Sequence, residues 1–381
     1  MSETSSFATS VLNPSKLTPA RFDLIASNFI CNCPLVKIAS RIIFKLVSLK
    51  CKPESSQALI IFITTTGHGR TVDSLVRKTF GCVTPDVRHV TYDQAFRWDK
   101  APIATYIFTD IERLYPWERF LAGQLHRLLG RQGCRCLNDP ALVMTRYPLL
   151  LSLHRAGLNP FNAYRADAYP EPERFPVFVR MDFNHKHPVS DLLHSQGELN
   201  TRLEQSQKNG MSLSNLLVIE FFGEPIAEGA WRRWGTFRIG EATQTDHCVV
   251  ENNWIVKYGT LGLSTNEMFE EEQQAVITNR FADDLTPAFK IGHIDYGRAD
   301  HAVVNGKTVT YEINTNPYLG AFAPHPRSAL RTQTIRLGRE KYAANLDRID
   351  TREGGHVALE KSPAMMNYVA TNGDRRPVLR P

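Results

Sequence analysis

The sequence contains little cysteine, no long apolar run and no block of like charge, and each shortage narrows the class of protein that it encodes. Seven cysteines among 381 residues are few and odd in number, which indicates reduced thiols in a cytoplasmic protein. The pairs Cys31/Cys33 and Cys134/Cys136 have no further cysteine or histidine at the spacing of a zinc site. We therefore interpret the cysteines as scattered thiols and not as metal ligands.

Signals for secretion and for membrane insertion are also missing. The N-terminal segment MSETSSFATS has no basic stretch followed by an apolar core, so we expect no signal peptide. The most apolar stretch, residues 35–47, is too short to span a bilayer and contains three basic residues. Its helical spacing predicts a basic amphipathic helix, which we expect to pack on the protein's own core and not on a membrane surface.

The charge is mild, with a formal net value of +6 that no single tract concentrates. Nucleic-acid binding is therefore not indicated, whereas acidic small ligands such as nucleotides are compatible with this balance. With 42% hydrophobic and 22% charged residues, the composition is that of an ordinary globular protein. The length predicts two or three structural units.

No phosphate-binding loop of the GxxxxGK[ST] type occurs, and the turn at Gly67-His68-Gly69 lacks the third glycine of a dinucleotide fingerprint. We interpret this turn as a tight connection between a buried strand and a helix. A second strand over 103–108 and a helix over 116–129 follow it. This alternation predicts a small α/β domain over residues 56–137, after an N-terminal extension over 1–55.

From residue 138 onward the predicted elements are mixed, which indicates an α+β pair of lobes over 138–348. The apolar strand NLLVIEFF, within 215–222, marks the expected boundary between the lobes. We expect residues 349–381 to form a partly disordered tail, because this segment is rich in Arg, Gly and Pro and lacks periodicity. The fold class is thus a combination of α/β and α+β units.

The stretch YGRADHAVVNGKTVTYEINTNP, residues 296–317, reads as a β-hairpin with Asn305-Gly306 in the turn. A two-residue turn would place Asp300 and Glu312 on opposite faces of the hairpin. A three-residue loop with Gly306 in the left-handed conformation would place Arg298 opposite Glu312. We predict this second register, in which four polar side chains share a face: Arg298, Asp300, Glu312 and Asn314.

Such a face combines two carboxylates and an amide oxygen, which are hard donors suited to Mg²⁺ or Mn²⁺, with one guanidinium suited to phosphate. The alternative is a solvated outer face on which Arg and Glu pair across the strands. The hairpin alone does not decide between the two.

At these residues the sequence resembles the ATP-grasp superfamily, which includes D-alanine–D-alanine ligase and glutathione synthetase. Gly297-Arg298-Ala299-Asp300 and Glu312-Ile313-Asn314 look like the G-R-x-D and E-x-N strands of that superfamily. The resemblance covers residues 138–340, and the 58–135 unit fits the small domain that precedes it. It implies a two-lobed ATP-grasp-like fold, metal ligation by Asp300, Glu312 and Asn314, and contacts from Arg298 to the reacting groups.

Other positions follow in the order that the superfamily shows. Arg146 and Arg180 stand where two nucleotide-binding lysines are usual, and Lys257 resembles a later lysine that reaches the phosphates. The resemblance also implies an adenine-binding hinge at the end of the apolar strand, formed by Glu220, Phe221 and Phe222.

The sequence departs from the superfamily in two respects. Arginine replaces lysine at two positions, which keeps phosphate binding but widens the cationic group. The loop MDFNHKHPVS, residues 181–190, lacks the glycines that usually close it on the phosphates. We expect the side chains of His185 and Lys186 to cap the phosphates in place of the missing backbone amides. The alternative is a restructured loop with solvated side chains.

The resemblance implies an ATP- and Mg²⁺-dependent carboxylate–amine or carboxylate–thiol ligase that forms an acyl phosphate and releases ADP and phosphate. A small-molecule kinase of the same type and a catalytically silent nucleotide-binding protein remain alternatives. The expected partners are small carboxylate and amine substrates, and a homodimer stays open as the oligomeric state. We assign Arg233 and Asn316 to the substrate, within a wall over 224–253 that also includes Trp234, Arg238 and His247.

Overall fold

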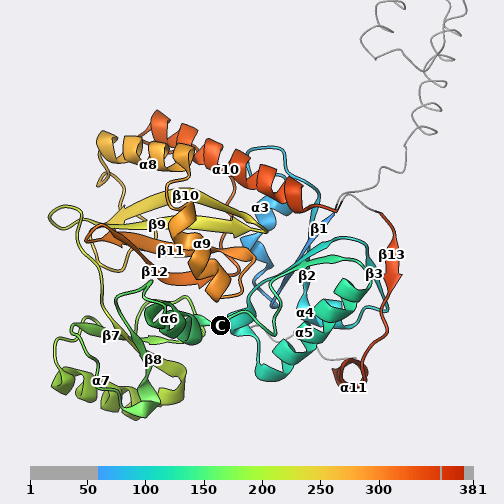
Figure 1. Ribbon diagram of the computed structural model, residues 1–381, viewed down its shortest axis with the longest axis horizontal. Helices are drawn as coiled ribbons and strands as arrows, with labels where there is room; N and C mark the ends of the chain where they lie inside the picture. Colours follow the sequence, from blue (N-terminus) through green and yellow to red (C-terminus); the bar gives the residue numbers. More distant parts are fainter. Residues whose placement is uncertain (1–58, 352–353, 373–381) are drawn as a thin grey trace, which may run out of the picture. The chain divides into compact units, whose positions relative to one another are not determined.

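A four-stranded parallel sheet comes first in the computed structural model, which describes residues 59–351 and 354–372 (Figure 1). Its strands are β1 (Ile60–Thr64), β2 (Val87–Thr91), β4 (Thr105–Phe108) and β5 (Arg135–Leu137), in the order β2-β1-β4-β5. β1 is buried along its whole length, as expected of an apolar run in a sheet covered on both faces. β2 pairs with one side of β1 and β4 with the other side, all in parallel. The loops that follow β1 and β4 therefore meet at the C-terminal edge of the sheet.

Short helices and one long helix accompany this sheet: η2 (Gly69–Thr71), α3 (Asp73–Val76), α4 (Tyr92–Phe96), η3 (Ile111–Arg113) and α5 (Pro116–Arg131). α5 begins with a proline at its first position, and the Glu118 carboxylate accepts a hydrogen bond from the Tyr115 backbone N–H at 2.9 Å. Leu121, Leu125 and Leu129 recur at helical spacing and are buried in the core beside the sheet.

A three-stranded antiparallel sheet follows, in the order β6-β8-β7. Apolar residues of α7, such as Leu199 and Leu203, share a core with Val177 and Val179 of the sheet. The elements of this part are α6 (Arg146–Arg155), β6 (Ala163–Arg165), η4 (Ala166–Ala168), β7 (Val177–Met181), α7 (Gln196–Lys208), η5 (Leu213–Asn215) and β8 (Leu216–Glu220).

The largest sheet is antiparallel and has the order β10-β9-β11-β12 (Figure 1). Its strands are β9 (Trp231–Ile239), β10 (Ala242–Glu251), β11 (Tyr296–Val304) and β12 (Lys307–Asn314). Three helices pack against it: α8 (Asn266–Thr278), α9 (Ala282–Ile291) and α10 (Ala329–Ile349).

The two faces of this sheet have different covers. On one face Trp234 packs on Phe281, with ring centroids 5.0 Å apart, between α8 and α9. On the other face Phe237 packs at 5.0 Å on Tyr342 of α10. Side chains two residues apart on a strand share a face. Gly235 and Arg233 therefore lie on the same face of β9 as Phe237, which is the face that α10 covers. The part of that face beyond α10 borders the cavity described below.

The mixed α/β class expected from the sequence is confirmed by one parallel and several antiparallel sheets. The segment after Asp350 contains two elements that the sequence analysis did not predict, β13 (His356–Ala358), which pairs with β3 (Lys100–Pro102), and α11 (Pro363–Asn372). The expected amphipathic helix over 35–47 lies outside the described residues, and the domain limits stay predictions. Within the described ranges, no helix has both the length and the apolar character needed to cross a membrane.

Candidate functional site

The hairpin between β11 and β12 has a different register from the predicted one. Asn305 and Gly306 form a two-residue turn with φ values of 50° and 75°, and Val304 pairs with Lys307. This is the turn geometry that an Asn-Gly pair favours, so the prediction of a three-residue loop was wrong. Next to the turn, the observed pairing alone would set Asp300 and Glu312 on opposite faces.

A β-bulge in β12 reverses that consequence. His301 pairs with Thr310 but Asp300 pairs with Glu312, so Tyr311 is the extra residue. Beyond the bulge, Arg298 lies opposite Asn314 and not opposite Glu312 as predicted. The four polar side chains of the hairpin therefore do share one face, because of the bulge and not because of the turn.

This face borders a cavity of about 500 Å³ between the β6-β8-β7 sheet and the four-stranded antiparallel sheet. The four hairpin residues all line it, and so do several further residues predicted for the site. These are Arg180, His185, Lys186, Glu220, Phe221, Phe222, Arg233 and Lys257.

Aromatic rings form one part of the cavity wall. Trp254 lies 5.2 Å from Phe178 and 5.5 Å from Phe221, and Phe221 lies 5.7 Å from Trp231, measured between ring centroids. The carboxylate of Glu220 accepts hydrogen bonds from the Tyr164 hydroxyl at 2.8 Å and from a backbone N–H of the loop before β6 at 2.9 Å. Glu220 thus fixes the strand ends, while the rings offer an apolar slot for a flat ligand.

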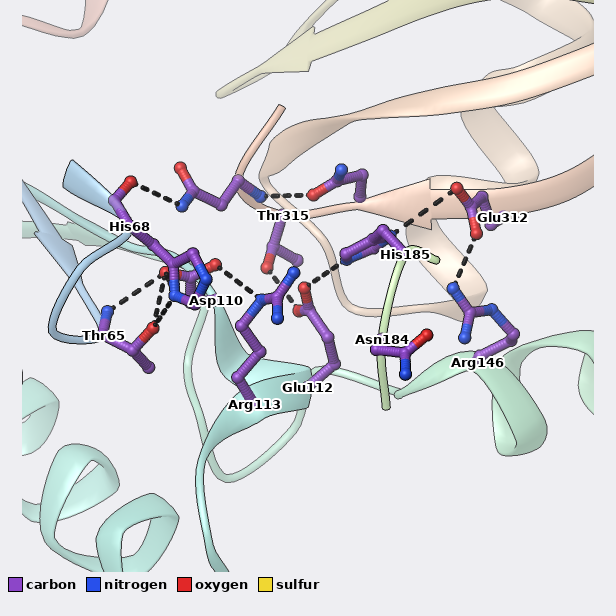
Figure 2. A network of polar contacts seen from close by, with 12 residues as sticks. Thr65, His68, Asp110, Glu112, Arg113, Arg146, Asn184, His185, Glu312 and Thr315 are labelled. Carbon is purple, nitrogen blue, oxygen red and sulfur yellow. Dashed lines mark hydrogen bonds and ion pairs between the residues drawn. The ribbon is translucent and has the colours of Figure 1, made fainter. Parts of the chain in front are cut away.

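Glu312 is the centre of a cluster of cations (Figure 2). Its carboxylate lies 2.7 Å from Arg146 Nη2, 3.5 Å from Arg180 Nη2 and 3.7 Å from His185 Nδ1. Burial opposes the ionisation of Glu312, but Arg146, His185 and Arg180 outweigh it and hold the pKa of its carboxyl well below the usual range. Burial next to Arg146 lowers the pKa of Arg180 to about 10, so its guanidinium remains charged at neutral pH.

Asp300 has its own pair of guanidinium groups. Arg298 Nε donates to its carboxylate at 3.1 Å, and Arg233 Nη1 forms a close ion pair with its other oxygen. Arg233 Nη2 also donates to the backbone oxygen of Lys257 at 3.1 Å. Burial opposes the charge of Arg298, but Asp300 raises the pKa of its guanidinium above the ordinary value.

A residue from the parallel sheet reaches this cluster (Figure 2). Glu112, in the short helix η3 after β4, accepts a hydrogen bond from His185 Nε2 at 2.8 Å and another from the Thr315 hydroxyl at 3.0 Å. Burial disfavours the charge on His185, but Glu112 and Glu312 on its two sides raise its pKa to about 9. His185 is therefore an imidazolium held between two carboxylates at neutral pH.

The loop over 182–187 is fastened to the cavity through main-chain atoms as well. Lys257 Nζ donates to the backbone oxygen of His185 at 2.9 Å, and Arg146 Nη1 donates to those of Met181 and Asp182 at 3.0 and 2.6 Å. A loop without glycine is thus held against the cavity by cationic side chains.

Positive charge exceeds negative charge around the two carboxylates of the hairpin. The cations are Arg146, Arg180, His185, Arg233, Lys257 and Arg298, and the carboxylates are Glu112, Asp300 and Glu312. Among the described residues, the buried Nε atoms of Arg180 and Arg233 have no hydrogen-bond partner. Unpartnered buried donors are costly, and the oxygens of a polyanionic ligand would satisfy them.

The fit of a divalent cation rests on the chemistry of the donors. The described ranges contain no group of three or more His, Cys, Asp and Glu side chains arranged for a metal ion. Two carboxylates and an amide oxygen on one face are nonetheless the hard donor set that Mg²⁺ takes together with water and phosphate. The donors fit if Arg180 and Arg233, which line the cavity, exchange the carboxylates for ligand phosphates.

Several predicted residues lie away from the cavity wall. Arg146 lies behind Glu312, where it borders a separate small cavity of about 20 Å³. Asn316 is buried and accepts a hydrogen bond from the Thr71 hydroxyl at 2.6 Å, so it joins the loop after β12 to the loop after β1. Trp234 and Arg238 do not line the cavity, because they lie on the opposite face of β9 from Arg233.

Three contributors to the site were not predicted from the sequence. Glu112 follows the buried strand β4, whereas its partner His185 follows β7. The only signal in the sequence was the position of Glu112 after a buried strand, where functional residues of parallel sheets are common. Phe178 and Trp254 are one aromatic pair, but they come from segments 76 residues apart in the sequence. No local pattern predicts that such rings meet.

The structure is similar to solved structures of several ligases, although no family profile and no curated protein sequence matches the chain. A D-alanine–D-alanine ligase from Bacillus anthracis, determined with ATP, is 12% identical, with a TM-score of 0.42 over 76% of this chain and 99% of that chain. The enzyme of the same name from Coxiella burnetii is 13% identical, with a TM-score of 0.41 over 77% and 98% of the two chains. A D-cycloserine synthetase is 13% identical, with a TM-score of 0.40 over 77% and 100%.

Proposed function

We propose that the protein is an ATP- and Mg²⁺-dependent ligase that joins a carboxylate to an amine or a thiol through an acyl phosphate, and releases ADP and phosphate. One observation carries this proposal: an excess of cations faces two carboxylates on neighbouring strands, at the end of a cavity with an aromatic slot. Slot, cations and paired carboxylates are the chemical counterparts of a base, a polyphosphate and its divalent cation.

Each group of residues has a defined part in this proposal. The rings of Phe178, Phe221 and Trp254 hold adenine, and the guanidinium groups of Arg180 and Arg233 turn their free Nε donors to the phosphates. Asp300, Glu312 and Asn314 would hold Mg²⁺, which supplies charge neutralisation on the phosphates during their transfer. Lys257 and His185 fasten the loop that covers the phosphates.

The chain's own groups contribute positioning and electrostatics. A substrate carboxylate attacks the γ-phosphorus of ATP, the bond from that phosphorus to the β–γ bridging oxygen breaks, and ADP leaves with the electron pair. The acyl phosphate that forms carries an electrophilic carbonyl carbon. Arg298 lies next to the carboxylates on the shared face, where its guanidinium stabilises the oxyanion that develops when the acceptor attacks. No nucleophilic side chain is required by this scheme.

A small-molecule kinase and a silent nucleotide-binding protein use the same cavity in different ways. A kinase transfers the phosphoryl group to a hydroxyl and yields ADP with a phosphorylated product. A silent protein binds ATP without forming ADP. The products therefore separate the three functions.

Positional isotope exchange tests the ligase directly. ATP labelled with ¹⁸O in the bridge between the β and γ phosphorus atoms is incubated with Mg²⁺, the protein and one carboxylic acid at a time, without an amine. Reversible formation of an acyl phosphate moves the label to the non-bridging β positions, so exchange that depends on the acid is expected. Absence of exchange over a broad panel of carboxylic and amino acids, together with ATP binding, would show that the proposal is wrong.

A further inference from the structure

A second bulge in the large sheet turns an aspartate and a histidine toward the cavity side. In β10, Thr245 pairs with Thr236 and His247 pairs with Gly235, so Asp246 is the extra residue. The side chains of Asp246 and His247 lie together, and His247 Nδ1 forms a close hydrogen bond with Asp246 Oδ2. Adjacent residues of a regular strand point to opposite faces, so this contact requires the bulge.

The register aligns His247 with the two carboxylates of the hairpin. His247 pairs with Gly235, Gly235 with Asp300, and Asp300 with Glu312, which makes one row across all four strands on one face. Neighbouring strands lie about 4.8 Å apart, so His247 stands roughly two strand spacings from Asp300. Position 235 lacks a side chain, and a Cβ there would come within 3.1 Å of Arg298 Cδ. The side chain of Arg298 thus fills the gap between the imidazole and the carboxylates.

The hydrogen bond between Asp246 and His247 has the direction that a general base requires. Burial opposes the ionisation of Asp246, but His247 outweighs it and lowers the pKa of its carboxyl, so Asp246 is an anion that only accepts hydrogen bonds. His247 Nδ1 therefore carries the hydrogen, and in the neutral ring Nε2 keeps its lone pair. Among the described residues, Nε2 has no hydrogen-bond partner, and His247 lines the cavity.

Other groups in the cavity wall are less suited to accept a proton. Of the three histidines that line it, His185 is an imidazolium between two carboxylates, and His187 is exposed on the loop. The carboxylates of Asp300 and Glu312 are each engaged by two guanidinium groups. His247 remains as the group on the shared face whose second ring nitrogen is not engaged.

We propose that His247 is the general base that deprotonates the acceptor of the ligation, with Asp246 as its positioning residue. This assignment rests on the proposed ligase function, and its steps are written for a protonated amine as the acceptor. One proton of the incoming ammonium passes to His247 Nε2, and the free amine attacks the acyl carbon. The C–N bond forms and the C–O bond to the phosphate breaks. Phosphate leaves with the electron pair of that bond and takes the second nitrogen proton, as HPO₄²⁻.

Two acceptors of different basicity test the base. The carboxylic acid selected by isotope exchange is supplied with ATP, Mg²⁺ and either an alkylamine, which is protonated at neutral pH, or hydroxylamine, which is largely unprotonated. In the His247→Gln variant we expect amide formation from the alkylamine to fall by about 10²- to 10⁴-fold, which is the usual contribution of general-base catalysis. Hydroxamate formation from hydroxylamine is expected to fall far less.

The Asp246→Asn variant tests whether Asp246 positions the imidazole of His247. The measurement is the site of the ring hydrogen, which would not change if Asp246 only stabilised the fold. Long-range ¹H–¹⁵N NMR spectra identify the protonated ring nitrogen of His247, whose signals are assigned by their loss in His247→Gln. We expect Nδ1 to carry the hydrogen of the neutral ring in the wild type, and a mixture of both forms in Asp246→Asn. His194, an exposed histidine before α7 that does not line the cavity, supplies the matched control His194→Gln.

The outcomes separate this assignment from the function on which it rests. If wild-type protein shows no acid-dependent isotope exchange, the ligase proposal is wrong and the base assignment falls with it. If exchange persists but His247→Gln forms amide at the wild-type rate, only the base assignment is wrong. Equal losses with alkylamine and hydroxylamine, or a hydrogen on Nε2 of the neutral wild-type ring, also overturn it. Isotope exchange by the variant itself shows that its active site is folded.

Discussion

Arg146 and Glu312, which lie 166 positions apart in the chain, form a hydrogen-bonded ion pair with 2.7 Å between Nη2 and Oε2. The two side chains are only 5% and 17% exposed. The other end of the same guanidinium donates to two backbone oxygens at the end of β7. One arginine therefore fastens the start of α6, the end of β7 and strand β12 to one another, and Figure 2 shows its contact with Glu312.

Replacing Arg146 by lysine should cost stability although the charge is kept. A single ammonium cannot reproduce the fork that reaches both Glu312 and the β7 backbone oxygens. We expect the free energy of unfolding, measured by urea denaturation, to fall by about 2 to 4 kcal/mol, because buried charge and buried carbonyl groups lose their partners. Arg155→Lys, at the exposed end of the same helix, is the matched control and should change it by less than about 0.5 kcal/mol. Equal effects of the two changes would contradict the assigned role of the fork.

Glu312→Gln should remove turnover while the nucleotide still binds. The amide keeps the shape of the side chain but withdraws one negative charge from the site of Arg146, Arg180 and His185. We expect at least a 100-fold loss of acid-dependent isotope exchange and tighter binding of ATP in the absence of Mg²⁺, measured by calorimetry. Glu204→Gln on the exposed side of α7 serves as the control. Turnover that survives in Glu312→Gln would show that the metal assignment is wrong.

The aromatic slot predicts that Trp254→Ala weakens ATP binding. Trp254 contacts Phe178 and Phe221, and stacking of a base on an aromatic ring is worth about 1–3 kcal/mol. We expect the dissociation constant of a non-hydrolysable ATP analogue to rise by about 10- to 100-fold, with a smaller change for inorganic triphosphate, which has no base. Trp117→Ala, a change on the surface of α5, should leave both constants unchanged. An equal loss of affinity for both ligands would mean that adenine does not bind at Trp254.

His301 should make the protein sensitive to acid. Its ring is fully buried beside Phe281, and burial together with Arg233 lowers its pKa from 6.5 to about 3. In the unfolded chain the imidazole takes up a proton near pH 6.5, so its contribution to stability is complete above that pH and is lost as the pH falls toward 3. Below pH 6.5 the free energy of unfolding should therefore fall by about 1.4 kcal/mol per pH unit through this residue.

Chemical denaturation at pH 7 and pH 5 measures this slope. His301→Gln removes the titrating group, so its stability should depend less steeply on pH than that of the wild type, even if it is lower at both values. His194→Gln, an exposed position, should keep the wild-type slope. Identical slopes for all three proteins would mean that His301 is protonated in the folded state.

The sequence predicted the parts of the fold and of the site that local patterns determine. Apolar runs and helical periodicity located β1, β8 and α5 within a few residues, since burial and spacing are local signals. The shared face of Asp300 and Glu312 was predicted on a wrong turn, because a bulge of one residue leaves no mark in an alternating pattern. Contacts between distant segments, such as that of Glu112 with His185, depend on tertiary packing and could not be predicted from sequence spacing.

The extra residue Tyr311 sets the phase of β12 beyond it. Its hydroxyl donates to the backbone oxygen of Phe222 at 2.8 Å, which anchors the extra residue across the cavity. If the strand kept all its residues but lost the bulge, the two-residue turn would dictate the phase of the whole strand, so that Ile313 would turn into the cavity and Glu312 toward the helices α6 and α9. The anchored tyrosine thus keeps a carboxylate on the cavity side and keeps its charge out of the apolar interior.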